Sequence, residues 1–139
     1  MATLSRVSYN DDVIAEFRAN AGKVGGHWEG RDLLLLTTTG RKSGRSHTTP
    51  MVFTRDGDRV LVYASKAGAP KHPDWYLNLV ADPHVVVEVG PERHDAVATP
   101  LEGDERDRQF AAQAERVPTF AEYQAKTERT IPVVALTRA

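Results

Sequence analysis

The sequence predicts a mainly β domain with flanking helices, an α+β arrangement of about six short antiparallel strands. Apolar runs are short and bounded by turn residues, and two pairs of runs are joined by hairpin signals. Helical periodicity falls mostly near the two ends of the chain, so strands and helices do not alternate as βαβ units. An antiparallel barrel or sandwich is therefore favoured over a doubly wound sheet, and a barrel would leave no open edges.

A helix is expected over residues 11–21. Its apolar face, at helical spacing, consists of Val13, Ile14, Phe17 and Ala21. Asn10 or Ser8 is the expected N-cap. Three partners for this face stay open at the level of sequence: the barrel, a second subunit or a membrane surface.

The first strand expected is Leu33–Thr39, a run of leucine and threonine short enough for a buried strand. A hairpin follows, in which Thr48–Arg55 and Arg59–Ser65 flank Asp56-Gly57-Asp58. In its second strand, side chains alternate between two faces. One face holds Val60, Val62 and Ala64, and the other holds Leu61, Tyr63 and Ser65.

The second half of the chain continues with a short helix over Pro73–Asp82, with the proline in its first turn. A second strand pair, Val85–Val89 and Ala96–Leu101, is separated by residues 90–93. Two helices over Asp104–Arg116 and Phe120–Arg129 and a terminal strand over Ile131–Thr137 complete the prediction.

Composition sets the class of protein. At 139 residues, with 40% hydrophobic and 27% charged residues, the chain is expected to be one soluble domain spanning residues 1–139. A net charge of −1 argues against broad nucleic-acid binding. There is no cysteine, no apolar run near the ~20 residues of a membrane span and no secretory signal, so a cytoplasmic protein is expected.

Positive charge gathers around two loops, the first of which follows the first strand. Residues 33–75 carry seven Lys or Arg against three Asp, a net +4 in a chain of −1. The loop itself, Gly40-Arg41-Lys42-Ser43-Gly44-Arg45, combines two glycines, a hydroxyl and three cations, which suits a phosphate or clustered carboxylates. The alternative reading is a solvated basic hairpin turn.

A second loop, residues 65–73, contains small residues that allow close backbone approach to a planar ligand, and Lys66 and Lys71 extend the positive surface. His72 is either a proton donor or a structural residue at the helix entry. Ser65 and Tyr123 are the hydroxyls best suited to face a pocket. The histidines show no metal-ligand spacing, so no metal site is predicted. Anion holders without an evident nucleophile fit an enzyme whose cofactor performs the chemistry.

Three segments carry a family resemblance: LLLLTTTGRKSGRSHTTPM, VYASKAGAPKHPDWYLNL and EYQAKTERTIPVVAL. Together they resemble the deazaflavin-dependent nitroreductase family, whose members use reduced coenzyme F(420), an 8-hydroxy-5-deazaflavin. The resemblance runs from about Leu33 to the C-terminus. It implies a split β-barrel like the FMN-binding barrels, and hydride transfer from C5 of the reduced ring to a quinone-like or nitroaromatic acceptor.

The resemblance also assigns residues. The coenzyme's phosphate and carboxylate-bearing tail would be held by Arg41, Lys42, Ser43 and Gly44. The deazaflavin ring would be lined by Pro50, Met51, Val52, Ala64, Ser65 and Lys66. The groove would be closed by Lys71, His72, Trp75 and Asn78. The proton could come from Ser65, Tyr123 or solvent. Lys126, in the wall near Tyr123, would make the acceptor pocket more polar, which favours quinones over nitroimidazole prodrugs.

Several alternatives stay open. The chain could use FMN or haem instead, or bind a deazaflavin without catalysis. A homodimer and a peripheral membrane contact are further options. Nucleic acid is disfavoured as a partner, because aromatic residues do not interleave with the cations.

Overall fold

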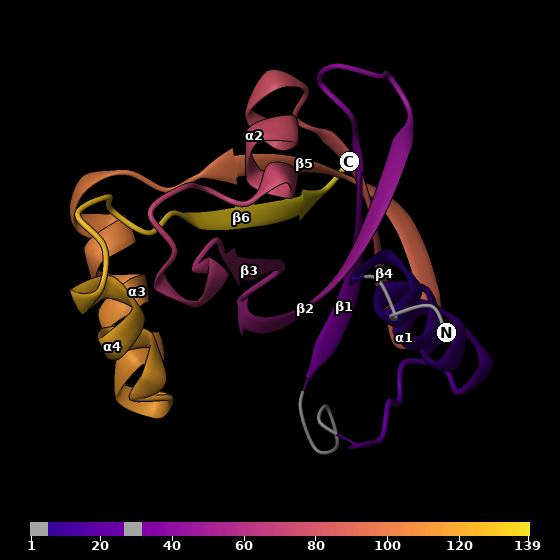
Figure 1. Cartoon of the computed structure of the whole chain (residues 1–139), viewed down its shortest axis with the longest axis horizontal. Helices are drawn as coiled ribbons and strands as arrows, with labels where there is room; N and C mark the ends of the chain where they lie inside the picture. The colour runs from indigo at the N-terminus through magenta and orange to yellow at the C-terminus, as the bar shows by residue number, and fades with distance from the viewer. Residues whose placement is uncertain (1–5, 27–31) are drawn as a thin grey trace, which may run out of the picture.

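The structure is a computed structural model that describes residues 6–26 and 32–139. Six strands of the described chain close into an antiparallel barrel in the order β1-β2-β3-β6-β5-β4 (Figure 1). Their bounds are β1 Leu33–Thr39, β2 Ser46–Asp56, β3 Arg59–Tyr63, β4 His84–Val89, β5 Glu92–Pro100 and β6 Val133–Arg138. The predicted fold, a split barrel of about six antiparallel strands with flanking helices, is confirmed.

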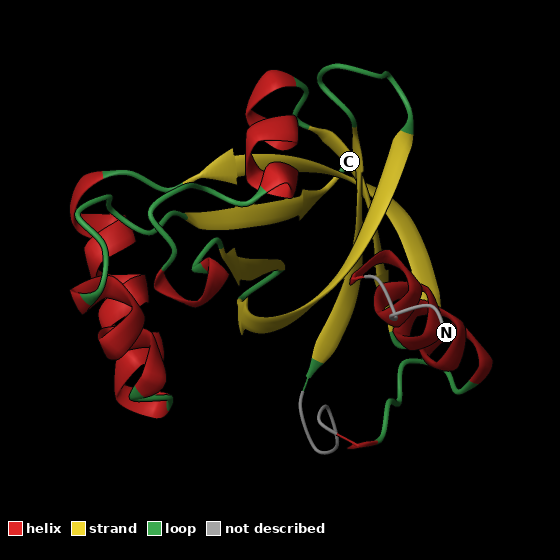
Figure 2. Cartoon of the chain, viewed as in Figure 1, coloured by secondary structure: helices red, strands yellow, loops and turns green. Residues whose placement is uncertain are grey.

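The helices lie around the barrel (Figure 2). They are α1 Arg6–Ala19, the short 3₁₀ helix η2 Lys66–Gly68, α2 Asp74–Ala81, α3 Gly103–Arg116 and α4 Thr119–Ala125. Helix α1 covers one side of the barrel, α3 and α4 stand together on the opposite side, and α2 lies beside the loop that joins β1 to β2 (Figure 1). Strand β2 follows the loop at residues 40–45 and pairs with β3, which leads into the loop at residues 65–73.

Side-chain alternation builds separate cores on the two faces of the sheet. In β1, Leu34 and Leu36 join the barrel interior, whereas Leu33 and Leu35 pack under α1. In β3, Val62 points inward, whereas Leu61 and Tyr63 pack toward α3 and α4. Because both faces of β1 are covered, it can be an unbroken run of leucine.

Helix α1 packs on the barrel. Of the three partners that the sequence left open for its apolar face, the barrel is therefore the one observed. Val13 and Phe17 are buried against Leu33 and Leu35. Arg18 adds a bidentate ion pair to Glu88 of β4, with Nε–Oε1 and Nη2–Oε2 distances of 3.0 and 2.8 Å. None of the described helices has the length and apolar character that crossing a membrane requires.

The start and end of α1 differ from the prediction. The helix begins at Arg6, so Asn10 and Ser8 lie inside it and cannot be its N-cap. Ala21 lies beyond its end, is exposed and has a φ of +54°, so it does not belong to the apolar face. The apolar pattern misplaced both ends, because the helix extends upstream of that pattern to Arg6 and the chain turns at residues 20–22.

Two further boundaries differ. The turn of the second hairpin contains only Gly90 and Pro91, and β5 starts at Glu92. Gly90 has a φ of +57°, as a tight type II′ turn requires at its first central position. Helix α4 ends at Ala125 rather than Arg129, because the residues that follow are fixed by tertiary hydrogen bonds.

Candidate functional site

The loop at residues 40–45 is a tight turn closed by its own backbone. Gly40 N–H donates to the Arg45 carbonyl at 2.7 Å, and Gly44 N–H donates to the Gly40 carbonyl at 2.8 Å. Ser43 Oγ accepts from Arg45 N–H at 3.1 Å. A Cβ at Gly40 would lie 2.7 Å from Ser43 Oγ and 2.8 Å from His47 Nε2, so a larger residue there would displace these two side chains. The turn is thus a rigid support for the cations that it carries.

Arg41 anchors this loop to α2. Asn78 Oδ1 accepts from the Arg41 backbone N–H at 3.2 Å and from Nη1 at 2.8 Å, and Arg41 Nη2 lies 3.3 Å from Asp74 Oδ1. Asn78 is only 4% exposed. By contrast, Lys42 is exposed, and no acidic side chain of the described residues pairs with it. Arg45 is exposed as well, but of these two cations Lys42 is the one that lines the cavity described next.

A cavity of about 650 Å³ lies between this loop, the start of β2 and α2. We call it the basic cavity. It is lined by Asp11, Gly40, Arg41, Lys42, Ser43, Ser46, His47, Thr48, Thr49, Asp74, Trp75 and Asn78.

The second loop has an unusual backbone. Three successive residues, Lys66, Ala67 and Gly68, have φ values of +45°, +53° and +80°. Such conformations are costly for residues with a Cβ and persist where surrounding structure enforces them. A Cβ at Gly68 would lie 2.7 Å from the Tyr123 carbonyl oxygen, so α4 packs directly on this loop.

Arg129 holds the same loop from the other side. Its guanidinium donates to the backbone carbonyls of Ala64, Ser65 and Ala69 at 3.0, 2.7 and 2.9 Å. Burial lowers the pKa of Arg129 from its ordinary value, but an arginine stays charged throughout the physiological range. Three carbonyl oxygens around one cation fix the path of the chain from Ala64 to Ala69.

His72 is tied into this cluster. Its Nδ1 lies 3.1 Å from Arg129 Nη1, and because a guanidinium can only donate, Nδ1 is the acceptor. Burial and then the positive charge of Arg129 lower the pKa of His72 below its ordinary value. His72 is therefore neutral at physiological pH, with its proton on Nε2. These contacts fit the structural role that the sequence left as an alternative.

A second cavity of about 640 Å³ lies between β2, the second loop and the α3–α4 wall. We call it the aromatic cavity, after Tyr63, Trp75, Phe120 and Tyr123. Its remaining lining residues are Thr49, Pro50, Met51, Val52, Ser65, Lys66, Ala67, Pro73, Asp74, Gln113, Val117 and Thr119. Thr49, Asp74 and Trp75 line both cavities, so the two adjoin along β2, and together we call them the groove.

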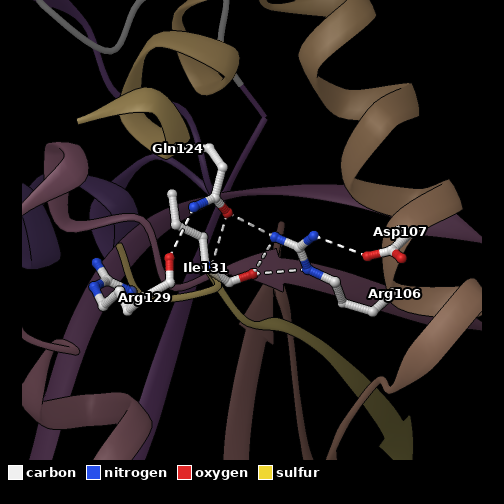
Figure 3. A network of polar contacts seen from close by, with 5 residues as sticks. All are labelled: Arg106, Asp107, Gln124, Arg129 and Ile131. Carbon is white, nitrogen blue, oxygen red and sulfur yellow. Dashed lines mark hydrogen bonds and ion pairs between the residues drawn. The ribbon is translucent and has the colours of Figure 1, made fainter. Parts of the chain in front are cut away.

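The α3–α4 wall is held by a hydrogen-bond network (Figure 3). Arg106 on α3 donates to Gln124 Oε1 at 2.9 Å and to the Ile131 carbonyl at 2.7 Å. Gln124 Nε2 donates to the Arg129 carbonyl at 2.8 Å, so Gln124 joins Arg106 to the main chain of Arg129. The network thereby positions both the wall of the aromatic cavity and the residue that clamps its loop.

Most of the predicted site residues meet in this groove. The basic cavity receives Arg41, Lys42, Ser43 and Asn78, and the aromatic cavity receives Pro50, Met51, Val52, Ser65, Lys66 and Tyr123. Trp75 borders both. Gly44, Ala64, Lys71 and His72 do not line either cavity. Ala64 is buried, and it contributes a carbonyl oxygen to Arg129.

Sequence reasoning missed two residues here, Arg129 and Gln113. Arg129 gave no local signal, because its partners lie about 60 residues earlier in the chain. Gln113 left a weak signal: it is the polar member of an otherwise apolar stripe, with Phe110 and Ala114 on α3 and Val117 directly after the helix. Among the described residues, no group of three His, Asp or Glu side chains is placed to hold a metal ion.

The groove fits a ligand with two unlike parts. Each cavity falls within the range of about 300–1,000 Å³ that is typical of small-molecule sites. The basic cavity offers Lys42 on a turn that contains two glycines. The aromatic cavity offers walls of aromatic and aliphatic side chains. An elongated molecule with a flat ring and an anionic tail matches both ends.

Comparison with known proteins identifies the family to which the chain is similar. The family model described as F420H(2)-dependent quinone reductase matches residues 11–138. An F420H(2)-dependent quinone reductase of Mycobacterium tuberculosis (strain ATCC 25618 / H37Rv) is 40% identical over 128 residues, which cover 89% of this chain and 86% of that protein.

Comparison with solved structures agrees with the comparison of sequences. That of an F420-H2 dependent reductase (FDR-A) superposes with a TM-score of 0.69 at 42% identity, covering 81% of this chain and 99% of that one. A structure described as a domain-swapped dimer superposes with a TM-score of 0.71 at 36% identity, covering 95% and 99%. The resemblance seen in the sequence is confirmed, and the chain belongs to the F420H(2)-dependent quinone reductase family.

Proposed function

We propose that this protein is a reductase that passes a hydride from reduced coenzyme F(420) to a quinone-like acceptor. The observation that carries the proposal is the groove along β2, in which the basic cavity adjoins the aromatic one. The names of the relatives support the same coenzyme and acceptor class.

In the basic cavity, Lys42 would hold the phosphate and the carboxylate-bearing tail. Its charge is best placed for a ligand, whereas Arg41 is engaged by Asn78 and Asp74. We assign Arg41 and Asn78 to positioning the loop, because their hydrogen bonds run to each other. A charge-assisted contact from Lys42 is worth about 1.5–3 kcal/mol.

In the aromatic cavity, Pro50, Met51 and Val52 of β2 would support the ring, with Trp75 at its edge and the Ser65–Ala67 loop beside it. When bound, the reduced deazaflavin supplies the hydride, that is, two electrons and one proton. The protein's part is to orient the two reactants and to exclude water. The clamp by Arg129 keeps the loop in one conformation for that purpose.

The acceptor would lie between the ring and the α3–α4 wall, where Phe120 and Tyr123 pack edge to face with centroids 5.6 Å apart. A quinone takes up the hydride and one proton to become the hydroquinone. The hydroxyls of Ser65 and Tyr123 border this cavity and are our candidates for proton delivery. A nitroaromatic acceptor is a secondary proposal, since the named relatives are quinone reductases.

The domain-swapped dimer among the similar structures supports a proposal of dimerisation. A peripheral membrane contact gains no support from α1, because the apolar residues Val13 and Phe17 are covered by the barrel.

Titration with candidate coenzymes tests the proposal. Trp75 borders both cavities, so a bound ring should quench its fluorescence. We expect saturable quenching by coenzyme F(420) and little by FMN or haem. Trp28 lies outside the described residues, so a Trp75→Phe variant is titrated in parallel to assign the signal. Tighter binding of FMN or haem than of the deazaflavin would contradict the proposal.

A further inference from the structure

Gln113 lies on the inner face of α3 and is 2% exposed. Phe110, one turn earlier, is buried as well, and Val117, one turn later, is half-buried. A primary amide has two donor hydrogens and an acceptor oxygen, and its burial among apolar groups is costly unless these are hydrogen-bonded. A fully buried glutamine in such a stripe therefore calls for a partner.

The described residues supply none. No side-chain or backbone group of residues 11–26 and 32–139 forms a hydrogen bond with the Gln113 amide, whereas Gln124 of α4 uses both ends of its amide. Within the same residues, Thr127 Oγ1 is the one fully enclosed side-chain polar atom that lacks a partner. Gln113 lines the aromatic cavity, so a molecule bound there is the partner that its amide can meet.

The other residues around Gln113 do not offer an equivalent hydrogen-bonding group from α3. The Tyr63 hydroxyl also borders the cavity, but it is hydrogen-bonded to Thr54 Oγ1 at 2.7 Å. Val117 and Phe120 beside Gln113 are apolar. Of the residues on α3, Gln113 is therefore the polar one that lines this cavity, whereas the hydroxyls of Thr119 and Tyr123 come from α4.

We propose that the Gln113 amide donates a hydrogen bond from Nε2 to a carbonyl oxygen of the quinone acceptor; this rests on the proposed function. Hydride uptake converts the quinone into the hydroquinone monoanion, and one further proton completes the hydroquinone. Negative charge grows on a carbonyl oxygen during that step. A donor held in place beforehand stabilises the charge in the transition state more than in the bound quinone.

The test compares Gln113→Met with Gln109→Met. Methionine keeps the length of the side chain and removes the amide, and Gln109 is a half-buried residue of α3 that lines neither cavity. With menadione as acceptor, kcat/KM should fall roughly three- to tenfold in Gln113→Met and stay unchanged in Gln109→Met. The menadione Kd, measured with oxidised coenzyme bound so that no turnover occurs, should rise in Gln113→Met alone.

Two further readouts separate this role from a structural one. Coenzyme affinity should be unchanged, and the Tm of Gln113→Met should not fall, because no protein partner of the amide is lost. A lower Tm with normal kinetics, or a weaker coenzyme affinity, would overturn the assignment. If Gln113→Met does not fold, Gln113→Leu repeats the comparison.

The outcomes distinguish the two claims. A wild-type protein that binds the coenzyme but reduces no quinone overturns the proposed function. A wild-type protein that reduces menadione, together with a Gln113→Met variant of equal kcat/KM, overturns the role of Gln113 alone.

Discussion

Arg129 donates a hydrogen bond of 2.7 Å from Nη2 to the backbone carbonyl of Ser65, 64 residues earlier in the chain. Ser65 is followed by three residues with left-handed backbone conformations, starting at Lys66. The contact therefore lets a residue between α4 and β6 hold a strained loop that borders the aromatic cavity. The geometry of the ring-binding end depends on a side chain that does not line it.

Replacement of Arg129 by alanine should weaken both the fold and the site. Three carbonyl oxygens lose a charged donor, so the free energy of unfolding in urea should drop by about 2–3 kcal/mol. Coenzyme affinity should drop as well, because the loop is released. Arg138→Ala is the control: its exposed ion pair with Glu92 should contribute less than about 1 kcal/mol. Equal effects of the two variants would refute the clamp.

His72 should make stability depend on pH. Burial and the charge of Arg129 lower its pKa in the folded state, so the unfolded chain binds its proton more readily. Neutral His72 therefore contributes fully to the free energy of unfolding above the unfolded pKa of about 6.5. This contribution is lost as the pH falls through the lower pKa of the folded state. The measurement is the free energy of unfolding at about pH 7.5 and 5.5. His72→Asn retains an acceptor but does not titrate, so it should show a smaller difference between the two pH values. An identical difference in both proteins would show that His72 is not the group responsible.

Lys42→Ala should weaken coenzyme binding far more than it slows turnover at saturation. Loss of one charge-assisted contact corresponds to a rise in Kd of roughly tenfold to a hundredfold. Lys23, which is exposed and lines neither cavity of the groove, gives the matched control. An unchanged Kd for Lys42→Ala at low salt would remove the anion site from the 40–45 loop.

Tyr123 should serve the acceptor rather than the coenzyme. Tyr123→Phe keeps the ring beside Phe120 and loses one neutral hydrogen bond to the acceptor. That loss should raise the activation free energy by about 0.5–1.5 kcal/mol, so menadione kcat/KM should fall several-fold. Tyr123→Ala also removes the aromatic wall and should cost more. Coenzyme Kd, titrated for both variants, should match the wild type. Reduced coenzyme affinity with intact acceptor kinetics would reverse our orientation of the groove.

The parts of the molecule that rest on local chemistry were predictable. The run of leucines marks β1, Asp56-Gly57-Asp58 marks the first hairpin, and the glycines and cations of 40–45 mark the basic cavity. What could not be predicted depends on segments that meet only in the fold. Arg129 acquires its role because the chain returns past the second loop, and Gln113 because α3 is packed against the cavity. That Asn78 and Asp74 engage Arg41 rather than Lys42 likewise depends on where the fold places α2.

Anaerobic turnover tests the central claim most directly. Purified protein is mixed with reduced coenzyme F(420) and menadione, and the return of the oxidised coenzyme's visible absorbance is followed. The account predicts catalysed oxidation that saturates with both reactants and that Lys42→Ala impairs through coenzyme affinity and Tyr123→Ala through acceptor kinetics. Saturable coenzyme binding without any acceleration of menadione reduction over the protein-free mixture would contradict it.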